Sequence, residues 1–307
     1  MEHTLYKVAD DLFLVALNPP IPGYESFLSA WIYVGEVTFL VDTGPSVTAG
    51  ALVKALDSLG VNRLDYILLT HVHIDHAGAV GDLAVLFPET QVVCHSRGIP
   101  HLVDPHHLEI CSEKVLGETA RHYGPVRPVS EGRLLPAETF MSNAVMSVPT
   151  PGHASHHMSY HTDRYLFTGE AAGACFAGVL GMSYMRPSTP PPFYFDISVQ
   201  SLENLMELEP DRLCYGHFGS FEFGGRVLWQ HREQLRLWAS IVASEMSRGL
   251  VGMDLELNIL KTILENDPLI LPFLDMEGPL RLRELFFIQN SIKGFIGNAS
   301  RHVGPLS

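Results

Sequence analysis

The residues whose types and spacing most clearly indicate a functional site lie in the segment 70–78, which follows the apolar run 66–69. An apolar run that ends in a polar cluster predicts a buried strand with a loop at its end. That loop holds three histidines and an aspartate: His71, His73, Asp75 and His76. Imidazole nitrogens and a carboxylate suit zinc, iron or manganese. The spacing therefore predicts a metal site at the end of a strand.

Three later segments repeat the same arrangement of a short apolar run, a glycine and a ligand-type residue. Their ligand-type residues are His153, Glu170 and His217. Glycine permits the tight backbone turn that brings a side chain back over the edge of a sheet. Because the three follow a histidine cluster in series, we expect all of them to converge on the same site.

The order of these motifs resembles that of the metallo-β-lactamase fold superfamily, over roughly residues 10–220. The resemblance includes Leu40-Val41-Asp42-Thr43-Gly44, which looks like the early strand and turn of that family. It implies an α/β protein with an αβ/βα four-layer sandwich, in which two sheets pack face to face. Glyoxalase II-like enzymes of this superfamily also carry a helical C-terminal addition that helps to shape the substrate pocket.

Carried over position by position, the resemblance implies two divalent transition metals, with zinc as the first choice and iron or manganese as alternatives. One metal is expected on His71, His73 and His153. The other is expected on Asp75, His76 and His217. Two further residues are expected behind the ligands, Asp42 from the family motif and His157 as a hydrogen-bond partner four residues after His153.

Glu170 departs from the family pattern, because the family usually has a bridging aspartate at this position. Glutamate is one methylene longer than aspartate. Three outcomes therefore stay open: a reshaped bridge, a carboxylate that serves one metal only, or a weakened bridge. The number and identity of the metals depend on which of them holds.

Strand and helix patterns mix along the chain in a way that fits the sandwich. Runs rich in β-forming residues cover 12–15, 30–34 and 37–41, a helix is expected over 46–59, and a helical stretch runs through 106–122. After residue 222 the pattern becomes helical. We therefore divide the chain into a catalytic domain, 1–222, and a helical C-terminal extension, 223–307. The extension is expected to cap the catalytic domain, to shape the pocket or to form a homodimer interface.

The charge balance limits the classes of partner to expect, and the cysteines indicate the cellular compartment. The chain has 20 basic and 34 acidic residues and a formal net charge of −14. Nucleic acid and anionic membranes both require basic residues, so neither is expected, and a small molecule is the expected partner. Four scattered cysteines are typical of reduced core thiols, and the N-terminus lacks a signal-peptide pattern. These features predict a cytoplasmic protein.

The segment 176–195 is the best candidate for substrate contacts, because it leaves the metal face directly after Glu170. Arg186 is a candidate for binding an anionic group. Tyr184 and Tyr194 are candidates for donating a proton to an oxyanion.

The expected chemistry is hydrolysis by a hydroxide held between two metals about 3.5–4 Å apart. Asp75 is the candidate catalytic residue that orients the hydroxide and passes a proton. The first hypothesis is a metal-dependent hydrolase of a small thioester, ester or lactone, similar to glyoxalase II. The alternatives are an iron-dependent oxidoreductase of the same fold (persulfide dioxygenase-like or di-iron), a phosphodiesterase or nuclease, and a binding protein without turnover.

Overall fold

The computed structural model describes residues 5–179 and 182–302. Its first sheet has seven strands, in which each strand pairs with the next one along the chain. From the first to the fourth strand, each neighbouring pair is antiparallel, and from the fourth to the seventh, each neighbouring pair is parallel. These strands are β1 (Leu5–Lys7), β2 (Leu12–Leu17), β3 (Leu28–Tyr33), β4 (Phe39–Val41), β5 (Tyr66–Leu68), β6 (Gln91–Cys94) and β7 (Leu134–Pro136).

The second sheet has five strands in the order β14-β13-β10-β9-β8. β10 is parallel to β13, while β9 is antiparallel to both β8 and β10, so β8, β10 and β13 run in one direction. These five strands are β8 (Met146–Pro149), β9 (Met158–His161), β10 (Tyr165–Gly169), β13 (Arg212–Tyr215) and β14 (Ser220–Glu222).

A buried apolar layer joins the two sheets. Leu12 and Leu14 of β2 pack in this layer together with Phe167 of β10, whereas Val15 belongs to a second core beneath the helices. This difference follows from the alternation of side chains along a strand. Trp31 also donates a hydrogen bond from Nε1 to the backbone oxygen of Tyr215, 2.9 Å away in the other sheet.

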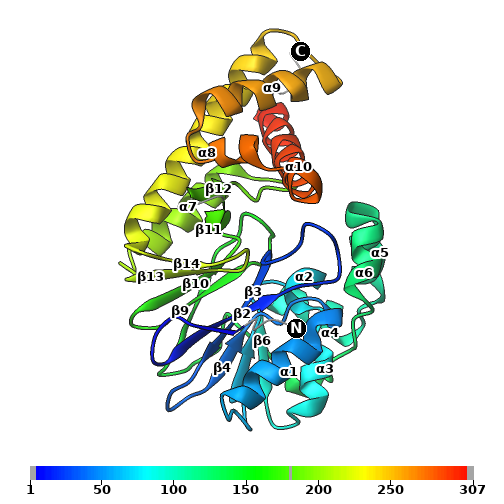
Figure 1. Cartoon of the computed structure of the whole chain (residues 1–307), viewed down its shortest axis with the longest axis vertical. Coiled ribbons are helices and arrows are strands. Elements are labelled where there is room, and N and C mark those ends of the chain that lie inside the picture. Colours follow the sequence, from blue (N-terminus) through cyan, green and yellow to red (C-terminus); the bar gives the residue numbers. More distant parts are fainter. Residues whose placement is uncertain (1–4, 180–181, 303–307) are drawn as a thin grey trace.

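The helices of this part are η1 (Ser46–Thr48), α1 (Ala49–Ser58), α2 (Ile74–Ala77), α3 (Val80–Leu86), η2 (Ser96–Gly98), α4 (Ile99–Val103), α5 (His106–Leu116), α6 (Glu118–Tyr123), η3 (Glu131–Arg133) and α7 (Phe195–Met206). Helices α1 and α3 lie beside the first sheet (Figure 1). On the second sheet, Leu166 and Leu213 share a buried core with the helical residues Leu202 and Leu205, so helices flank both sheets and give four layers. The predicted αβ/βα sandwich is therefore confirmed.

The predicted helical stretch through 106–122 is two helices. Gly117 separates α5 from α6 with a φ of +56°, a backbone conformation that glycine adopts readily. Cys111 lies on the exposed side of α5, so the prediction of four core thiols was wrong for this residue. Cys94, Cys175 and Cys214 are buried as expected.

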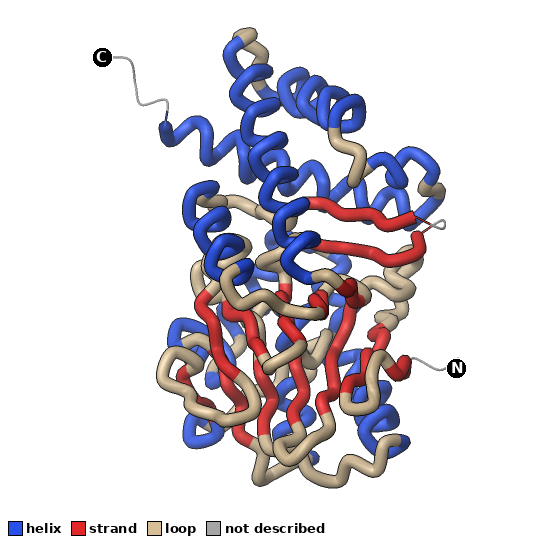
Figure 2. Tube along the Cα trace, turned by 90° about the vertical axis from the view of Figure 1, so that its left-hand side faces the viewer, coloured by secondary structure: helices blue, strands red, loops and turns tan. Residues whose placement is uncertain are grey.

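The C-terminal helices lie above the sandwich and share a buried apolar core with it (Figure 1). They are α8 (Gly224–Ser247), α9 (Gly252–Asn266), η4 (Leu271–Asp275) and α10 (Gly278–His302). The hairpin of β11 (Ala174–Val179) and β12 (Met182–Arg186) lies with them, away from both sheets (Figure 2). Met185 of the hairpin donates its backbone N–H to the oxygen of Leu269, and Gln234 of α8 donates to the oxygen of Met185. The division at residue 222 stays a prediction.

Among the described residues, no helix combines the length and the apolar composition needed to cross a bilayer.

Candidate metal centre

Four chain segments bring the predicted ligands to one edge of the sandwich. The loop after β5 and the short helix α2 carry His71, His73, Asp75 and His76. His153 follows β8, Glu170 follows β10 and His217 follows β13. Because these three strands run in one direction, their carboxyl ends lie at the same edge of the second sheet.

Backbone contacts fix the two sheet edges against each other. The N–H of Met158 donates to the oxygen of Thr70 over 2.7 Å, and the hydroxyl of Tyr160 donates to the oxygen of Leu69 over 2.9 Å. Gly169 has a φ of +53°, and a Cβ there would lie 2.7 Å from Cβ of Thr70, in the loop after β5. Glycine at 169 is therefore required both by the turn and by the close approach of the second sheet to the first.

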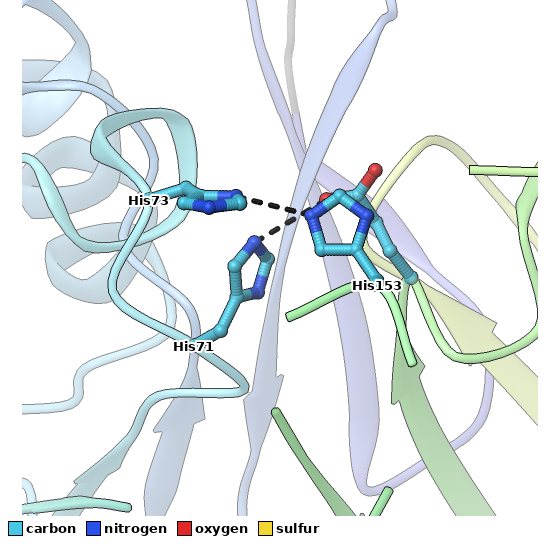
Figure 3. Close-up of side chains that lie close together, drawn as sticks. His71, His73 and His153 are labelled. Carbon is cyan, nitrogen blue, oxygen red and sulfur yellow. Dashed lines mark hydrogen bonds and ion pairs between the residues drawn. The ribbon is translucent and has the colours of Figure 1, made fainter. Parts of the chain in front are cut away.

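The first group of ligand atoms comes from His71, His73, His153 and Glu170. Figure 3 shows His71 and His73 approaching from one side and His153 from the other. Nε2 of His153 lies 3.0 Å from Nδ1 of His73 and 3.0 Å from Oε2 of Glu170. Nε2 of His71 lies 3.3 Å from the same carboxylate oxygen.

The second group comes from Asp75, His76 and His217. Nε2 of His76 and Nε2 of His217 are 3.3 Å apart. Oδ2 of Asp75 lies 3.8 Å from the His76 nitrogen and 3.7 Å from the His217 nitrogen. In each group, the ligand atoms lie within 4.8 Å of one another.

The carboxylate of Glu170 lies between the two groups. Its Oε2 faces the first group and also lies 3.4 Å from Nε2 of His76, while its Oε1 lies 3.3 Å from Nε2 of His217. Glu170 thus occupies the position of a shared carboxylate despite its extra methylene. The hydroxyl of Ser188 donates a hydrogen bond to Oε1 and holds the carboxylate from the side of β12.

Asp42 sets the tautomers of two of the histidines. Nδ1 of His76 donates to Oδ2 of Asp42 over 2.9 Å, which leaves Nε2 free to face the other ligands. The hydroxyl of Thr70 has one proton and donates it to Asp42, so it accepts from Nδ1 of His71, 3.1 Å away. His71 therefore also presents an unprotonated Nε2 to the cluster.

His157 supports Glu170 rather than facing the cluster itself. Its Nε2 accepts the backbone N–H of Glu170 over 3.1 Å, so its Nδ1 is the protonated nitrogen and donates to the hydroxyl of Thr150 over 2.8 Å. His153 is held in a similar way, because its Nδ1 donates to the backbone oxygen of Ser188. Contacts of this kind orient metal ligands.

Burial and neighbouring charges shift the pKa values of His71 and His73 in one direction and that of His76 in the other. Burial lowers the pKa of His71 well below its ordinary value and the pKa of His73 to about 4. Burial also acts to lower the pKa of His76, but the carboxylates of Asp75 and Asp42 outweigh it and raise that pKa. At neutral pH His71 and His73 are therefore neutral imidazoles, the form that binds metal ions.

The predicted substrate residues lie in three different surroundings. Arg186 lines a cavity next to the ligand cluster, and its Nε donates to Glu284 of α10 over 2.6 Å. Tyr184 is fully buried, donates to the same carboxylate and is not among the residues that line this cavity. Tyr194 is half exposed and lies beneath the guanidinium of Arg301. Substrate contact stays a prediction for all three residues.

Sequence reasoning did not single out Ser188 or Glu284. Ser188 lies inside the predicted substrate segment, but a serine between prolines carries no signal of its own. Glu284 lies in the middle of an amphipathic helix, 98 residues after Arg186. An acidic residue on the apolar face of that helix was the only available signal for a buried partner.

Comparison with known proteins agrees with this geometry. The model of the metallo-beta-lactamase superfamily matches residues 26–217, which is more than half of the chain. A metallo-beta-lactamase fold-containing protein of Sulfurisphaera tokodaii is 29% identical over 222 residues, which cover 69% of this chain and 80% of that protein. A hydroxyacylglutathione hydrolase of Acidiphilium cryptum is 30% identical over 194 residues. The aligned segment covers 61% of this chain and 63% of that enzyme.

Solved structures share the fold over nearly the whole chain. The crystal structure of an archaeal metallo-beta-lactamase superfamily protein from Sulfolobus tokodaii superposes with a TM-score of 0.68 and 24% identity, covering 94% of this chain and 98% of that one. The matched segment, 26–217, contains all seven predicted ligand residues. The chain belongs to the metallo-beta-lactamase superfamily.

Proposed function

We propose that the protein is a metal-dependent hydrolase of a small thioester, ester or lactone. Two divalent transition metals would be held at the cluster, with zinc as the first choice and iron or manganese as alternatives. The observation that carries this proposal is the position of Glu170, whose two carboxylate oxygens face two separate groups of ligand atoms. A shared carboxylate between two sets of histidines is suited to a two-metal site.

The donor atoms fit such a pair of cations. Nε2 of His71 is buried and has no hydrogen-bond partner. The Nε2 atoms of His71, His76 and His153 all point into the same small volume, and because the pKa of His76 is raised, a metal ion bound there would displace a proton. A buried lone pair without a donor costs free energy, and bound cations would satisfy all three nitrogens at once.

Once bound, two metal ions would supply a nucleophilic hydroxide at neutral pH and would polarise the substrate carbonyl. The chain's own residues provide the remaining functions. Asp75 borders the cavity beside the cluster, where it can orient the attacking water and accept its proton. Asp42, His157 and Ser188 keep the ligands in place. Arg186 borders the same cavity and is the proposed polar contact to the substrate.

The relatives support hydrolysis over the alternatives. One relative is a hydroxyacylglutathione hydrolase, a thioester-cleaving class of enzyme by its name. The acidic balance of the chain, with a formal net charge of −14, does not favour a nuclease. An iron-dependent oxidoreductase would use the same ligand cluster, so it is tested together with the hydrolase.

Metal content and activity of Glu170→Ala, Glu170→Asp and the parent test the proposal. The parent should bind more than one metal per chain and cleave a simple thioester anaerobically, and a chelator should abolish cleavage. Glu170→Ala should weaken metal binding by about 10-fold or more, at one site more than at the other. Glu170→Asp should retain two metals.

The control is Glu89→Ala, which alters an exposed glutamate remote from the cluster and should leave metal content and activity unchanged. Tight binding of both metals by Glu170→Ala would contradict the proposed bridge. Oxygen consumption with a persulfide, by an iron-loaded protein that hydrolyses nothing, would replace the hydrolase with an oxidoreductase.

A further inference from the structure

Two cavities meet at the metal ligands. The inner one has a volume of about 180 Å³ and borders Asp75, Glu170 and His217. The outer one is a groove of about 900 Å³. Both are lined by the same five residues at their junction, namely His73, Val115, His153, Pro190 and Asn290. A bound molecule can therefore extend from one cavity into the other across the ligands of the first group.

Apolar side chains form part of the wall of the inner cavity, beside the ligand residues and Arg186. They come from α2, α5 and α10 and from the loop after β12, and they are Ile74, Leu108, Val115, Leu116, Pro190 and Phe287. A cavity of about 150 Å³ has room for a benzene ring. The inner cavity is thus suited to an apolar group of about the size of one aromatic ring.

The guanidinium on the wall of the inner cavity is already engaged in an ion pair. Arg186 pairs with Glu284, 2.6 Å away and fully buried, a carboxylate that also pairs with Arg283. The guanidinium also lies over the ring of Phe287, 4.8 Å from the ring centre. An anionic part of the substrate is therefore better placed in the outer groove.

The outer groove carries positive charge in a chain that is acidic overall. Arg97 and Lys293 line it, and none of its lining residues is Asp or Glu. Arg97 is exposed and forms no ion pair with any described residue. Lys293 has its nearest carboxylate, that of Glu256, at 4.0 Å. Both cations are thus available to a ligand.

We propose that the substrate has two arms: an apolar acyl group of about one ring in the inner cavity, and an anionic leaving portion along the groove beside Arg97 and Lys293. This inference rests on the proposed function. Hydrolysis would break the bond between the acyl carbon and the leaving sulfur or oxygen and form a bond from that carbon to a water oxygen. One water proton goes to the leaving atom. The larger groove is the exit for the leaving portion.

Uncleavable thioethers test recognition apart from turnover. The probes are a benzyl thioether of 3-mercaptopropionate, the corresponding 2-mercaptoethyl phosphate and the neutral 2-mercaptoethanol compound, with binding to the metal-loaded protein measured by calorimetry. The two anionic probes should bind on the order of 10-fold more tightly than the neutral one, and salt should weaken the preference. The tighter of the two identifies the anion as carboxylate or phosphate.

The double variant Arg97→Gln/Lys293→Gln should lose this preference. The matched control, Lys54→Gln/Arg226→Gln, removes two exposed cations that do not line the groove and should keep it. Replacing Leu116 by Trp should weaken every benzyl probe relative to its methyl analogue, because the inner cavity is filled. Equal binding of charged and neutral probes, or a preference that survives the double variant, would overturn the assignment of the groove.

Turnover of benzoyl and acetyl thioesters with the same thiols separates this inference from the proposed function. Preferred cleavage of the benzoyl ester of the anionic thiol supports both. Discriminating thioether binding without any hydrolysis leaves the two-armed site standing and rejects the hydrolase. Hydrolysis of all these thioesters at equal rates supports the hydrolase and rejects the two-armed substrate.

Discussion

The floor and the roof of the cleft at the candidate metal centre are held in place by different forces. The floor consists of the seven predicted ligand residues, which lie on loops and on the short helix α2 and are fixed by hydrogen bonds to hydroxyls, backbone groups and Asp42. The roof consists of α10 and the β11–β12 hairpin, which are joined by the buried ion pair of Arg186 and Glu284. The floor therefore sets the chemistry, whereas the roof depends on a charge pair that is costly to break.

The largest expected effect is that of Glu284→Gln on the stability of the roof. Glu284 also accepts from Tyr184 and Arg283, so its replacement leaves buried cations uncompensated. We expect a loss of about 3–5 kcal/mol in the free energy of unfolding, measured with denaturant. Metal content in the folded protein should stay that of the parent.

The control is the pair Arg212–Glu222, which has the same N–O distance of 2.6 Å but a glutamate side chain that is 64% exposed. Glu222→Gln should cost no more than about 1 kcal/mol. If Glu284→Gln and Glu222→Gln lowered the free energy of unfolding equally, burial would not make the ion pair of the roof more important than an exposed one.

The contribution of Glu284 should disappear in acid. Burial raises the pKa of Glu284, but Arg186 and Arg283 outweigh it, so the folded-state pKa lies below the unfolded value of about 4.3. Its stabilising effect is therefore complete above about pH 4.3 and is lost as the pH falls through the folded-state pKa. Unfolding of metal-free parent and Glu284→Gln should show a constant gap from pH 8 to 5 that narrows below pH 4. A gap that does not narrow at all between pH 5 and pH 3 would contradict the ion pair.

A smaller effect is expected on the floor for Asp42→Asn. Asp42 has a φ of +57°, which asparagine tolerates, so the backbone should stay unchanged. The new amide donor faces Nδ1 of His76 and favours the tautomer that places the proton on Nε2. Metal affinity should fall about 10- to 100-fold in a competition assay with a chelator.

Asp82→Asn, at a partly exposed position on α3, is the control and should bind metal as the parent does. If Asp42→Asn bound metal as tightly as the parent, the hydrogen bonds of Asp42 would not be needed to hold the ligands. The floor would then be fixed in place by contacts other than those of Asp42.

The smallest effect is expected at a residue outside both the floor and the roof, between β14 and α8. Phe223 precedes α8, is 74% exposed and has a φ of +59°, an unfavourable conformation for an aromatic residue. Phe223→Asn should stabilise the protein by about 1 kcal/mol, seen as a higher thermal midpoint. Met141→Asn alters a residue that is 88% exposed and lacks a positive φ, so its midpoint should not rise.

The floor was predictable from the sequence because its ligands follow local patterns. Each of His153, Glu170 and His217 stands directly after a glycine at the end of a strand, and strand direction brings these ends together. The position of Glu170 between both groups could not be predicted, since it depends on side-chain geometry and on Ser188.

The roof was predictable only as a set of helices. The apolar spacing in α8 and α10 indicates buried faces, but it does not say what they cover. The pairing of Arg186 with Glu284 spans 98 residues, and no local pattern encodes a contact of that kind. The same holds for the apolar wall that α5 and α10 form together, because the two helices are distant in the sequence.

The spread of the ligands along the chain has a consequence for the order of folding events. His71, His73 and His76 lie in one loop, whereas His153 is 80 residues from His73 and His217 is 141 residues from His76. An unfolded chain can offer a metal only the local loop, because closing the longer segments requires both sheets. We therefore expect a refolding chain to take up its full complement of metal late, after the sandwich has assembled. Metal uptake then reports the completion of folding.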